Sequence, residues 1–305
     1  MASASSAAAT PLSNVPRTYA LITPVRDEEG NLPRLAAALE RQTLLPSAWI
    51  IVDDGSRDRT ADLLADLARK HAWIKPVDRG SDEGRGVAAG RREGRDLVSF
   101  RLGITALDEP VDVVMKLDAD VDFDADYCER LMARFAADPA LGIASGTCHE
   151  PEGGEWVRRT KADTTVWGAS RAYRWECVED IFGLEPRMGW DGLDELLAHV
   201  RGMRTETFVD LPFRHHRPEG GREHSSLHQG AALGRASWYM GYRPSYLAMR
   251  AFYRARRQPT AVAMLWGYAA AALAREPRYA NRAVVRLLRD RQRLRVTLRR
   301  GAPRS

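Results

Sequence analysis

Aspartates follow two apolar stretches of the chain, at the positions where those stretches end. Asp53 and Asp54 come after "AWIIV", and the run "DADVDFD" (118–124) comes after "VDVVMKL". Crowded carboxylates repel one another, so this run is either a solvated acidic loop or a group that a cation holds together. Asp118 and Asp120 lie nearest to the apolar stretch. Oxygen ligands at alternate positions suit Mg²⁺ or Mn²⁺, which bind through one or two carboxylates together with substrate phosphates.

Two other acidic segments lie at the starts of predicted helices. In "TPVRDEEGNL" (23–32), Asp27 or Glu28 either complements the dipole of the following helix or hydrogen-bonds a ribose or a base edge. In "GWDGLDE", Asp191 is either one of several acids in a first helical turn or a general base. Trp190 beside it offers a surface on which a sugar ring can stack.

Histidine and arginine supply the remaining candidates. "FRHHRPEGG" places His215 and His216 at the end of a predicted strand, and neutral imidazole is a common metal ligand. Such a pair is more often structural, but an Asp-x-Asp elsewhere makes one histidine a candidate third ligand. Arg85, in "GRGVAAGRREG", either reaches a phosphate or belongs to a basic helix face. That segment has neither the Walker nor the GxGxxG spacing.

Strands and helices alternate along the first 150 residues, which predicts an open, doubly wound α/β sheet. Ligands bind such sheets at the carboxyl ends of the strands, where the polar segments fall. The strands are predicted at 17–23, 48–54, 73–77, 111–118 and 141–147, and the helices at 31–43, 57–71, 86–107 and 125–137, the last capped by Asp124. Further along, we expect a strand entering a helix over 168–183, a helix over 191–203 and a strand over 206–216.

The composition is that of a globular protein in a reducing compartment. Of the 305 residues, 44% are hydrophobic and 29% are charged. Cys128, Cys148 and Cys177 lie far apart, without a CxxC motif or a histidine at ligand spacing, which argues against a disulfide framework or a zinc site. Residues 1–16 lack the basic and apolar regions of a secretory signal, so we expect a disordered tail there.

The C-terminal part, residues 235–305, differs in charge from the rest. It contains 17 arginines, no lysine and two acidic residues, a net charge of +15, whereas residues 1–234 carry −10. Its uncharged stretch 261–274 is too short to span a bilayer, which takes about 18–20 apolar residues. We expect a helical extension that either packs on the preceding domain or attaches to an anionic membrane surface. Nucleic-acid binding is not expected, because no nucleic-acid-binding fold accompanies the arginines.

The order of these motifs resembles that of the family 2 glycosyltransferases, inverting enzymes of the GT-A fold. The resemblance runs from "TPVRDEE" through "DDGS", "LDAD" and "GWDGLDE" to "HHRPEG", over about residues 17–217. It implies a GT-A-type doubly wound mixed sheet over residues 17–234. It also implies that the nucleotide sugar contacts Pro24, Arg26, Glu28, Asp54 and the ribose-side Asp118, and that Asp120 binds the metal.

The resemblance also suggests the reacting groups. Asp191 matches the family's catalytic base, although Trp190 stands where the family usually has an acid. Either histidine of "HHRP" completes the metal site, and we favour His216. We also predict that Arg85 contacts the phosphates of the donor. The chain lacks the Gln-x-x-Arg-Trp signature of processive polysaccharide synthases, which favours addition of a single sugar.

The sequence therefore predicts a metal-dependent glycosyltransferase that moves one sugar from a nucleotide diphosphate to a hydroxyl group, with inversion. The metal is Mg²⁺ or Mn²⁺, and the acceptor is a glycan or a lipid-linked saccharide of polysaccharide biosynthesis. We expect the enzyme on the cytoplasmic side, peripheral on the inner face of the cell membrane. The alternatives are a sugar-1-phosphate nucleotidyltransferase and a nucleotide-binding membrane adaptor without catalysis.

Overall fold

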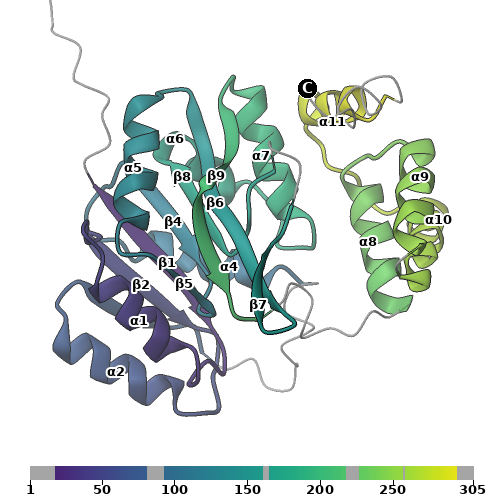
Figure 1. The fold of residues 1–305 in the computed structure, drawn as a ribbon. Coiled ribbons are helices and arrows are strands. Elements are labelled where there is room, and N and C mark those ends of the chain that lie inside the picture. Colours follow the sequence, from purple (N-terminus) through teal and green to yellow (C-terminus); the bar gives the residue numbers. More distant parts are fainter. Residues whose placement is uncertain (1–17, 81–92, 161–164, 218–226, 257, 294–305) are drawn as a thin grey trace, which may run out of the picture.

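The computed structural model describes residues 18–80, 93–160, 165–217, 227–256 and 258–293 (Figure 1). The predicted tail and Arg85 lie outside these residues. The strands are β1 (Tyr19–Val25), β2 (Ala48–Asp53), β3 (Ile74–Asp78), β4 (Val113–Leu117), β5 (Val121–Phe123), β6 (Leu141–Glu152), β7 (Glu155–Arg158), β8 (Ser170–Arg174) and β9 (Arg204–His215). The helices of the same region are α1 (Leu32–Glu40), α2 (Thr60–Lys70), α4 (Arg95–Thr105), α5 (Tyr127–Ala137), α6 (Trp175–Phe182) and α7 (Trp190–Val200).

One mixed sheet runs through this region in the order β3-β2-β1-β4-β8-β6-β9-β5, with β7 paired to β6. The strands β1 to β4 run parallel, as the strand–helix alternation predicted. Next to β4 the direction reverses, because β8 pairs with it in antiparallel fashion. Beyond β8, β6 and β9 are parallel to each other, and the short β5 closes this edge against β9. The strand ends after β1, β2 and β4 therefore open onto one edge of the sheet.

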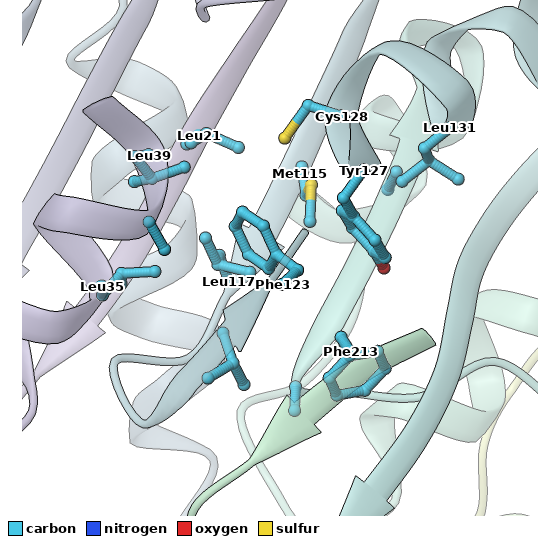
Figure 2. Close-up of a cluster of buried hydrophobic side chains, with 14 of the residues drawn as sticks. Leu21, Leu35, Leu39, Met115, Leu117, Phe123, Tyr127, Cys128, Leu131 and Phe213 are labelled. Atoms are coloured by element: carbon cyan, nitrogen blue, oxygen red, sulfur yellow. The ribbon is translucent and has the colours of Figure 1, made fainter. Parts of the chain in front are cut away.

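Helices cover both faces of the sheet, and each face has its own hydrophobic core. On β1, Leu21 points into the core beneath α1, α2 and α5, whereas Ile22 points into the core beneath α4, α6 and α7. Successive side chains of a strand face opposite sides, so a strand buried on both faces is apolar throughout. Figure 2 shows the first core, where the ring of Phe123 lies beside that of Tyr127 with centroids 4.8 Å apart.

The predicted elements agree with the structure in position and type, with two differences in detail. The helix predicted from 86 is described only as α4, which begins at Arg95, and residues 81–92 lie outside the described part. The predicted cap by the Asp124 side chain was wrong. The backbone carbonyl of Asp124 accepts from Tyr127 N–H, while its carboxylate pairs with Arg214, 3.2 Å away.

The described part of the C-terminal extension is helical and contains α9 (Pro244–Ala255), the 3₁₀ turn η1 (Pro259–Val262), α10 (Ala263–Leu273) and α11 (Arg282–Arg291). The boundary predicted between residues 234 and 235 falls inside α8 (Leu227–Tyr239), which is described here with the extension. It lies beside the sheet domain on the side of α7 (Figure 1). Tyr239 of α8 and Met240 just after it, and Val284 and Leu288 from α11, are buried in the same core as α7. Part of the extension therefore packs on the domain.

Helices α8 and α10 approach each other backbone to backbone. A Cβ atom added at Gly234 would lie 2.1 Å from the Met264 carbonyl oxygen, and one added at Gly267 would lie 1.9 Å from that of Ala231. No side chain of any size fits at these two positions without displacing a helix. The glycines are therefore required by the contact, although glycine lowers helix propensity.

We expect Gly234→Ala to destabilise the protein, by about 1–3 kcal/mol, because the added methyl group must push α10 away. On propensity alone this substitution would stabilise the helix by about 1 kcal/mol, so the sign of the change in thermal unfolding separates the two effects. Gly183→Ala is the control, since its Cβ would meet nothing nearer than 3.5 Å. A neutral or stabilising Gly234→Ala would show that the helices do not touch here.

Candidate active site

The loops after β1 and β2 are fastened to each other by hydrogen bonds. The backbone N–H of Glu28 donates to Thr60 Oγ1 at 2.9 Å, and that of Asp27 donates to Ser56 Oγ at 3.0 Å. In return, Arg57 N–H donates to Asp27 Oδ1 at 2.7 Å. Asp27 adopts a left-handed backbone with φ of 54°, a conformation that aspartate tolerates better than most residues. The two predicted nucleotide-contact segments therefore form one surface.

Glu28 is buried within this surface and is paired with a residue from the far end of the domain. Arg217, which follows β9, donates from its two terminal nitrogens to the two Glu28 oxygens at 2.8 and 3.3 Å. Burial raises the pKa of Glu28 above its usual value, while Asn31 and Arg217 counteract this shift. Pro24 lies in β1 beside Val52 of β2, and Arg26 is half-buried after the same strand.

The two aspartates after β2 have different partners. Asp53 Oδ1 accepts from Ser56 N–H at 2.8 Å and from Ser56 Oγ–H at 2.7 Å, which closes the turn into the following loop. Asp54 instead meets two arginines, Arg79 at 2.7 Å and Arg95 at 2.9 Å. Asp53 therefore shapes the loop, while Asp54 stands in a cationic environment at the sheet edge.

Asp118 and Asp120 occupy the loop between β4 and β5, each beside a cation. The ammonium group of buried Lys116 donates to Asp118 Oδ1 at 2.7 Å. Burial disfavours charge on Lys116, but Asp118 and Asp96 outweigh it and raise the lysine pKa. Asp120 Oδ1 lies 3.3 Å from His215 Nε2. Burial would raise the pKa of Asp120, yet His215 and Arg217 lower it overall.

The structure places His215, not His216, beside the aspartates that the sequence predicts as metal ligands. Adjacent residues of a strand point to opposite faces, so only one of the pair can face this site. His216 turns away and binds Asp122 through Nε2 at 2.5 Å, with its ring edge-on to Trp156. Our preference for His216 is therefore corrected to His215, the alternative that the sequence left open.

Asp118, Asp120 and His215 each offer one ligand atom, and these atoms all lie within 4.8 Å of one another. Two carboxylate oxygens and one imidazole nitrogen suit Mn²⁺ or Mg²⁺ better than a thiophilic metal. The 3.3 Å between Asp120 and His215 is longer than a good hydrogen bond, about 2.7–3.2 Å, and leaves room for an ion between them. The donor set therefore fits the predicted metal.

Helix α7 carries the predicted base and is tied to β8. Arg171 of β8 donates to the Asp191 backbone carbonyl at 2.6 Å, which fixes the start of the helix. Asp191 is half-buried, and within the described residues its carboxylate forms no hydrogen bond or ion pair. Two residues before Arg171 in the chain, the Ala169 carbonyl accepts from Asp118 N–H at 2.9 Å. The strand β8 and the residue just before it thus position both the predicted base and the Asp118 loop.

Trp190 does not occupy the stacking position that we expected. Its ring is only 4% exposed and lies against Phe100, with centroids 6.5 Å apart. Its indole N–H donates to the Asp96 carboxylate at 3.2 and 3.3 Å. The reason is helical geometry, because a residue at the first position of α7 faces the core along with Leu193. Trp190 therefore anchors the helix.

Beneath α7 lies a buried charge network that the sequence did not reveal. Arg171 donates to Asp194 at 2.6 Å and to Glu195 at 2.7 Å, and Tyr173 O–H donates to Asp194 at 2.7 Å. Burial raises the pKa of Glu195 to about 7. These acids hold the helix in place, and Asp191 is left as the acid of α7 that can meet a substrate.

The mixed sheet, with the Asp118–Asp120 loop after β4, has the GT-A fold. The profile of Glycosyl transferase family 2 matches residues 20–183, just over half of the chain, so the chain belongs to glycosyl transferase family 2. The match ends before Asp191 and His215, whose roles therefore depend on the geometry alone. No curated protein matches the chain in sequence.

Solved structures share this fold at low sequence identity. TarS 1–349 of S. aureus in complex with UDP-GlcNAc is 14% identical with a TM-score of 0.52, covering 72% of this chain and 66% of that one. GalNAc-T7 with UDP, GalNAc and Mn²⁺ is 14% identical with a TM-score of 0.54, covering 74% and 48%. The mannosyltransferase PcManGT of Pyrobaculum calidifontis with GDP-Man and Mn²⁺ is 17% identical with a TM-score of 0.50, covering 92% and 83%. This chain spans less than two thirds of the TarS structures, 39% of the longest.

We expect Arg171→Met to destabilise the protein by about 3–5 kcal/mol, because it leaves Asp194 and Glu195 buried without a cation. Urea unfolding at about pH 8, where both acids are driven to ionise, measures the effect most fully. Adding Asp194→Asn and Glu195→Gln to the same variant should recover part of the loss. A single variant as stable as the wild type would show that Arg171 does not balance these charges.

Proposed function

We propose that this protein transfers a single sugar from a nucleotide diphosphate to an acceptor hydroxyl group, with inversion at the anomeric carbon. The observation that carries the proposal is the convergence of Glu28, Asp54, Asp118 and Asp120 at one sheet edge in a family 2 chain. The structures similar in fold include complexes with UDP-GlcNAc and GDP-Man, which supports a nucleotide-sugar donor here.

The donor is assigned to the fastened loops after β1 and β2. Pro24, Arg26 and Glu28 line the first loop, and Asp54 lies at the second, so a nucleoside can contact both. Asp118 is assigned to the ribose, with Lys116 holding its carboxylate in place. Arg85 lies outside the described residues, and its contact with the donor phosphates stays a prediction.

Asp120 and His215 would hold the divalent metal, Mg²⁺ or Mn²⁺, with Asp118 beside them. When bound, such a metal acts as a Lewis acid that stabilises the charge of a departing diphosphate. Arg217 lies 3.4 Å from Asp120 and also binds Glu28, so it supplies further positive charge where the diphosphate leaves. The protein thus gathers cations at the leaving group.

Asp191 is proposed as the general base. Its carboxylate takes the proton of the acceptor hydroxyl as the oxygen attacks the anomeric carbon, on the face opposite the nucleotide. Asp194 and Glu195 are unsuited to this step because Arg171 and the core enclose them. The fixed start of α7, held through Arg171 and Trp190, keeps the base in one place.

We expect Asp120→Asn and Asp191→Asn to fail in different ways. In a thermal-shift panel with UDP-GlcNAc, GDP-Man and other nucleotide sugars, wild-type protein should be stabilised by its donor only with Mn²⁺ present. Asp120→Asn should lose that shift. Asp191→Asn should keep it, yet slow transfer or donor hydrolysis about 10²–10⁴-fold, the usual contribution of a general base.

Asp124→Asn is the matched control, because Asp124 belongs to the same acidic run but its side chain is 65% exposed. It should retain both binding and activity. Donor binding that ignores the metal would contradict the metal assignment. Release of pyrophosphate from a nucleoside triphosphate would support the nucleotidyltransferase instead, and an Asp191→Asn protein with full cellular activity would support the adaptor.

We further propose that the acceptor is a glycan or lipid-linked saccharide and that the extension binds the inner, cytoplasmic face of the cell membrane. On η1 and α10, the exposed side chains Val262, Trp266, Ala269 and Leu273 recur at helical spacing and form an apolar stripe. Trp266 is 72% exposed and Leu273 is 85% exposed. No helix of the described chain is long and apolar enough to cross a bilayer, so attachment would be at the interface.

Charge around the stripe suits an anionic lipid surface. Exposed Arg256 precedes η1, and exposed Arg275 follows α10. Basic residues near such a surface contribute about 1 kcal/mol each, and tryptophan favours the boundary between headgroups and acyl chains. The stripe lies in a run of 17 uncharged residues, 258–274, with arginine at both ends, and is therefore complementary to an anionic membrane.

We expect the full-length protein to float with phosphatidylglycerol-containing vesicles and not with phosphatidylcholine alone. The double variant Trp266→Glu with Leu273→Glu should lose flotation, because two exposed apolar side chains that would enter the lipid become charged. Val209→Glu is the control, since Val209 is also exposed, at 58%, but lies on β9. Wild-type protein that ignores anionic vesicles would refute membrane attachment. A dimer in solution that the double variant dissociates would assign the stripe to a second copy.

A further inference from the structure

His215 has a second set of neighbours on the side away from Asp120. Cys148 and Glu150 lie two residues apart on β6, so both side chains point to the same face of the sheet. The parallel register pairs His149 with Arg214, which brings Glu150 next to His215. One ligand atom from each of Cys148, Glu150 and His215 lies within 4.8 Å of the others, and all three residues are buried.

The two ring nitrogens of His215 face two different groups. Nε2 lies 3.3 Å from Asp120, and Nδ1 lies 3.5 Å from Glu150 Oε1. Two ligands of one tetrahedral zinc ion lie roughly 3.3–3.8 Å apart, as zinc–nitrogen and zinc–oxygen bonds of about 2.0 Å and zinc–sulfur bonds of about 2.3 Å require. The separation of Nδ1 from Oε1 is within this range and long for a hydrogen bond.

We infer that Cys148 Sγ, Glu150 Oε1 and His215 Nδ1 form a second cation site, selective for a thiophilic metal such as Zn²⁺. A thiolate together with an imidazole favours Zn²⁺ over Mg²⁺ and Mn²⁺, whereas the site on the Nε2 side has only hard oxygen ligands beside the histidine. Binding releases the protons of the thiol and of Nδ1 to solvent. In the sequence, no histidine lies at ligand spacing from a cysteine, which argued against a zinc site. In the structure the histidine comes from another strand, β9.

Arg159 prepares Glu150 for this role. Its Nε donates to the other carboxylate oxygen, Oε2, at 2.8 Å, and a terminal nitrogen donates to Glu152 at 2.7 Å. Oε1 is therefore the oxygen directed at His215. An arginine that holds one oxygen and leaves the second to a metal orients the ligand in the way that outer-sphere partners do in known metal sites.

The two sites share one imidazole, so they compete. A neutral imidazole has a lone pair on one nitrogen and a proton on the other. When Nδ1 binds a metal, Nε2 carries the proton and is no longer a ligand for the metal at Asp118 and Asp120. Zn²⁺ should therefore inhibit the metal-dependent reaction. Inhibition rests on the proposed function, whereas zinc binding itself does not.

Titration with Co²⁺, as a spectroscopic substitute for Zn²⁺, tests the site on the full chain. Wild-type protein should develop a near-ultraviolet thiolate-to-cobalt absorption band that Zn²⁺ abolishes. Cys148→Ser should lose the band, and Glu150→Gln should weaken Co²⁺ binding at least about tenfold. Cys177→Ser, which alters another buried free cysteine, should keep the band, as should Asp118→Asn. Thermal unfolding of each variant verifies that it folds.

A wild-type protein without the band, or a Cys148→Ser protein that keeps it, would overturn the inference. Zn²⁺ should also inhibit Mn²⁺-dependent donor hydrolysis in the wild type and lose most of that effect in Cys148→Ser. Zinc inhibition that is unchanged in Cys148→Ser would overturn the competition. A cobalt band in a protein that hydrolyses no nucleotide sugar would refute the proposed function and leave the cation site standing.

Discussion

Glu28, Asp54 and Asp120, at the carboxyl edge of the sheet, are each paired with a cation from another segment of the chain, and this pairing organises the site. Like charges gathered at the ends of neighbouring strands repel, and burial makes that repulsion stronger because the effective dielectric constant falls. The cations remove the repulsion, and they also connect the chain over long distances. Arg217 and Glu28 are separated by 189 residues, yet their contact joins the first loop to the end of β9. The acidic site thus depends on residues outside the acidic motifs.

Among these cations, His215 has the most central position. It ends β9, which is flanked by β5 on one side and β6 on the other. Each flanking strand brings a carboxylate, Asp120 from the loop before β5 and Glu150 from β6. The pKa of His215 is raised to about 10, because Asp120 and Cys148 outweigh the opposing effect of burial. The imidazolium between two carboxylates occupies the place where a divalent ion would supply the same compensation.

The motifs and their order were readable from the sequence because they depend on local patterns. Apolar runs ending in acids placed Asp54, Asp118 and Asp120 at strand ends, and helical periodicity placed Asp191 at the start of α7. Pairing between distant segments was not readable in this way. Which histidine faces Asp120 depends on the register of β9 against β5, and nothing within "HHRP" fixes that register. The same holds for Arg171, whose acidic partners Asp194 and Glu195 lie 23 and 24 residues away.

The prediction for Trp190 was wrong for a different reason. A local pattern suggested a role in sugar binding, and the packing of the side chain excludes that role. An aromatic residue beside a proposed base resembles a sugar platform, but the first turn of α7 must bury one face against α4. The large apolar ring fills that face, and the small, charged Asp191 is left on the side of the solvent. The anchoring of the base therefore comes from the neighbour that sequence reasoning assigned to the substrate.

In the extension, packing on the domain and the proposed membrane attachment are compatible, although the sequence presented them as alternatives. Met240 and Val284 bury one side of it in the α7 core, so it is part of the folded enzyme. Gly234 and Gly267 let α8 and α10 approach closely, and Trp266 and Leu273 of α10 lie on the outside. The side of α10 that packs on α8 is thus distinct from the side that presents its exposed apolar residues. Packing on the domain therefore does not compete with membrane attachment, because it fixes the orientation in which the stripe is presented.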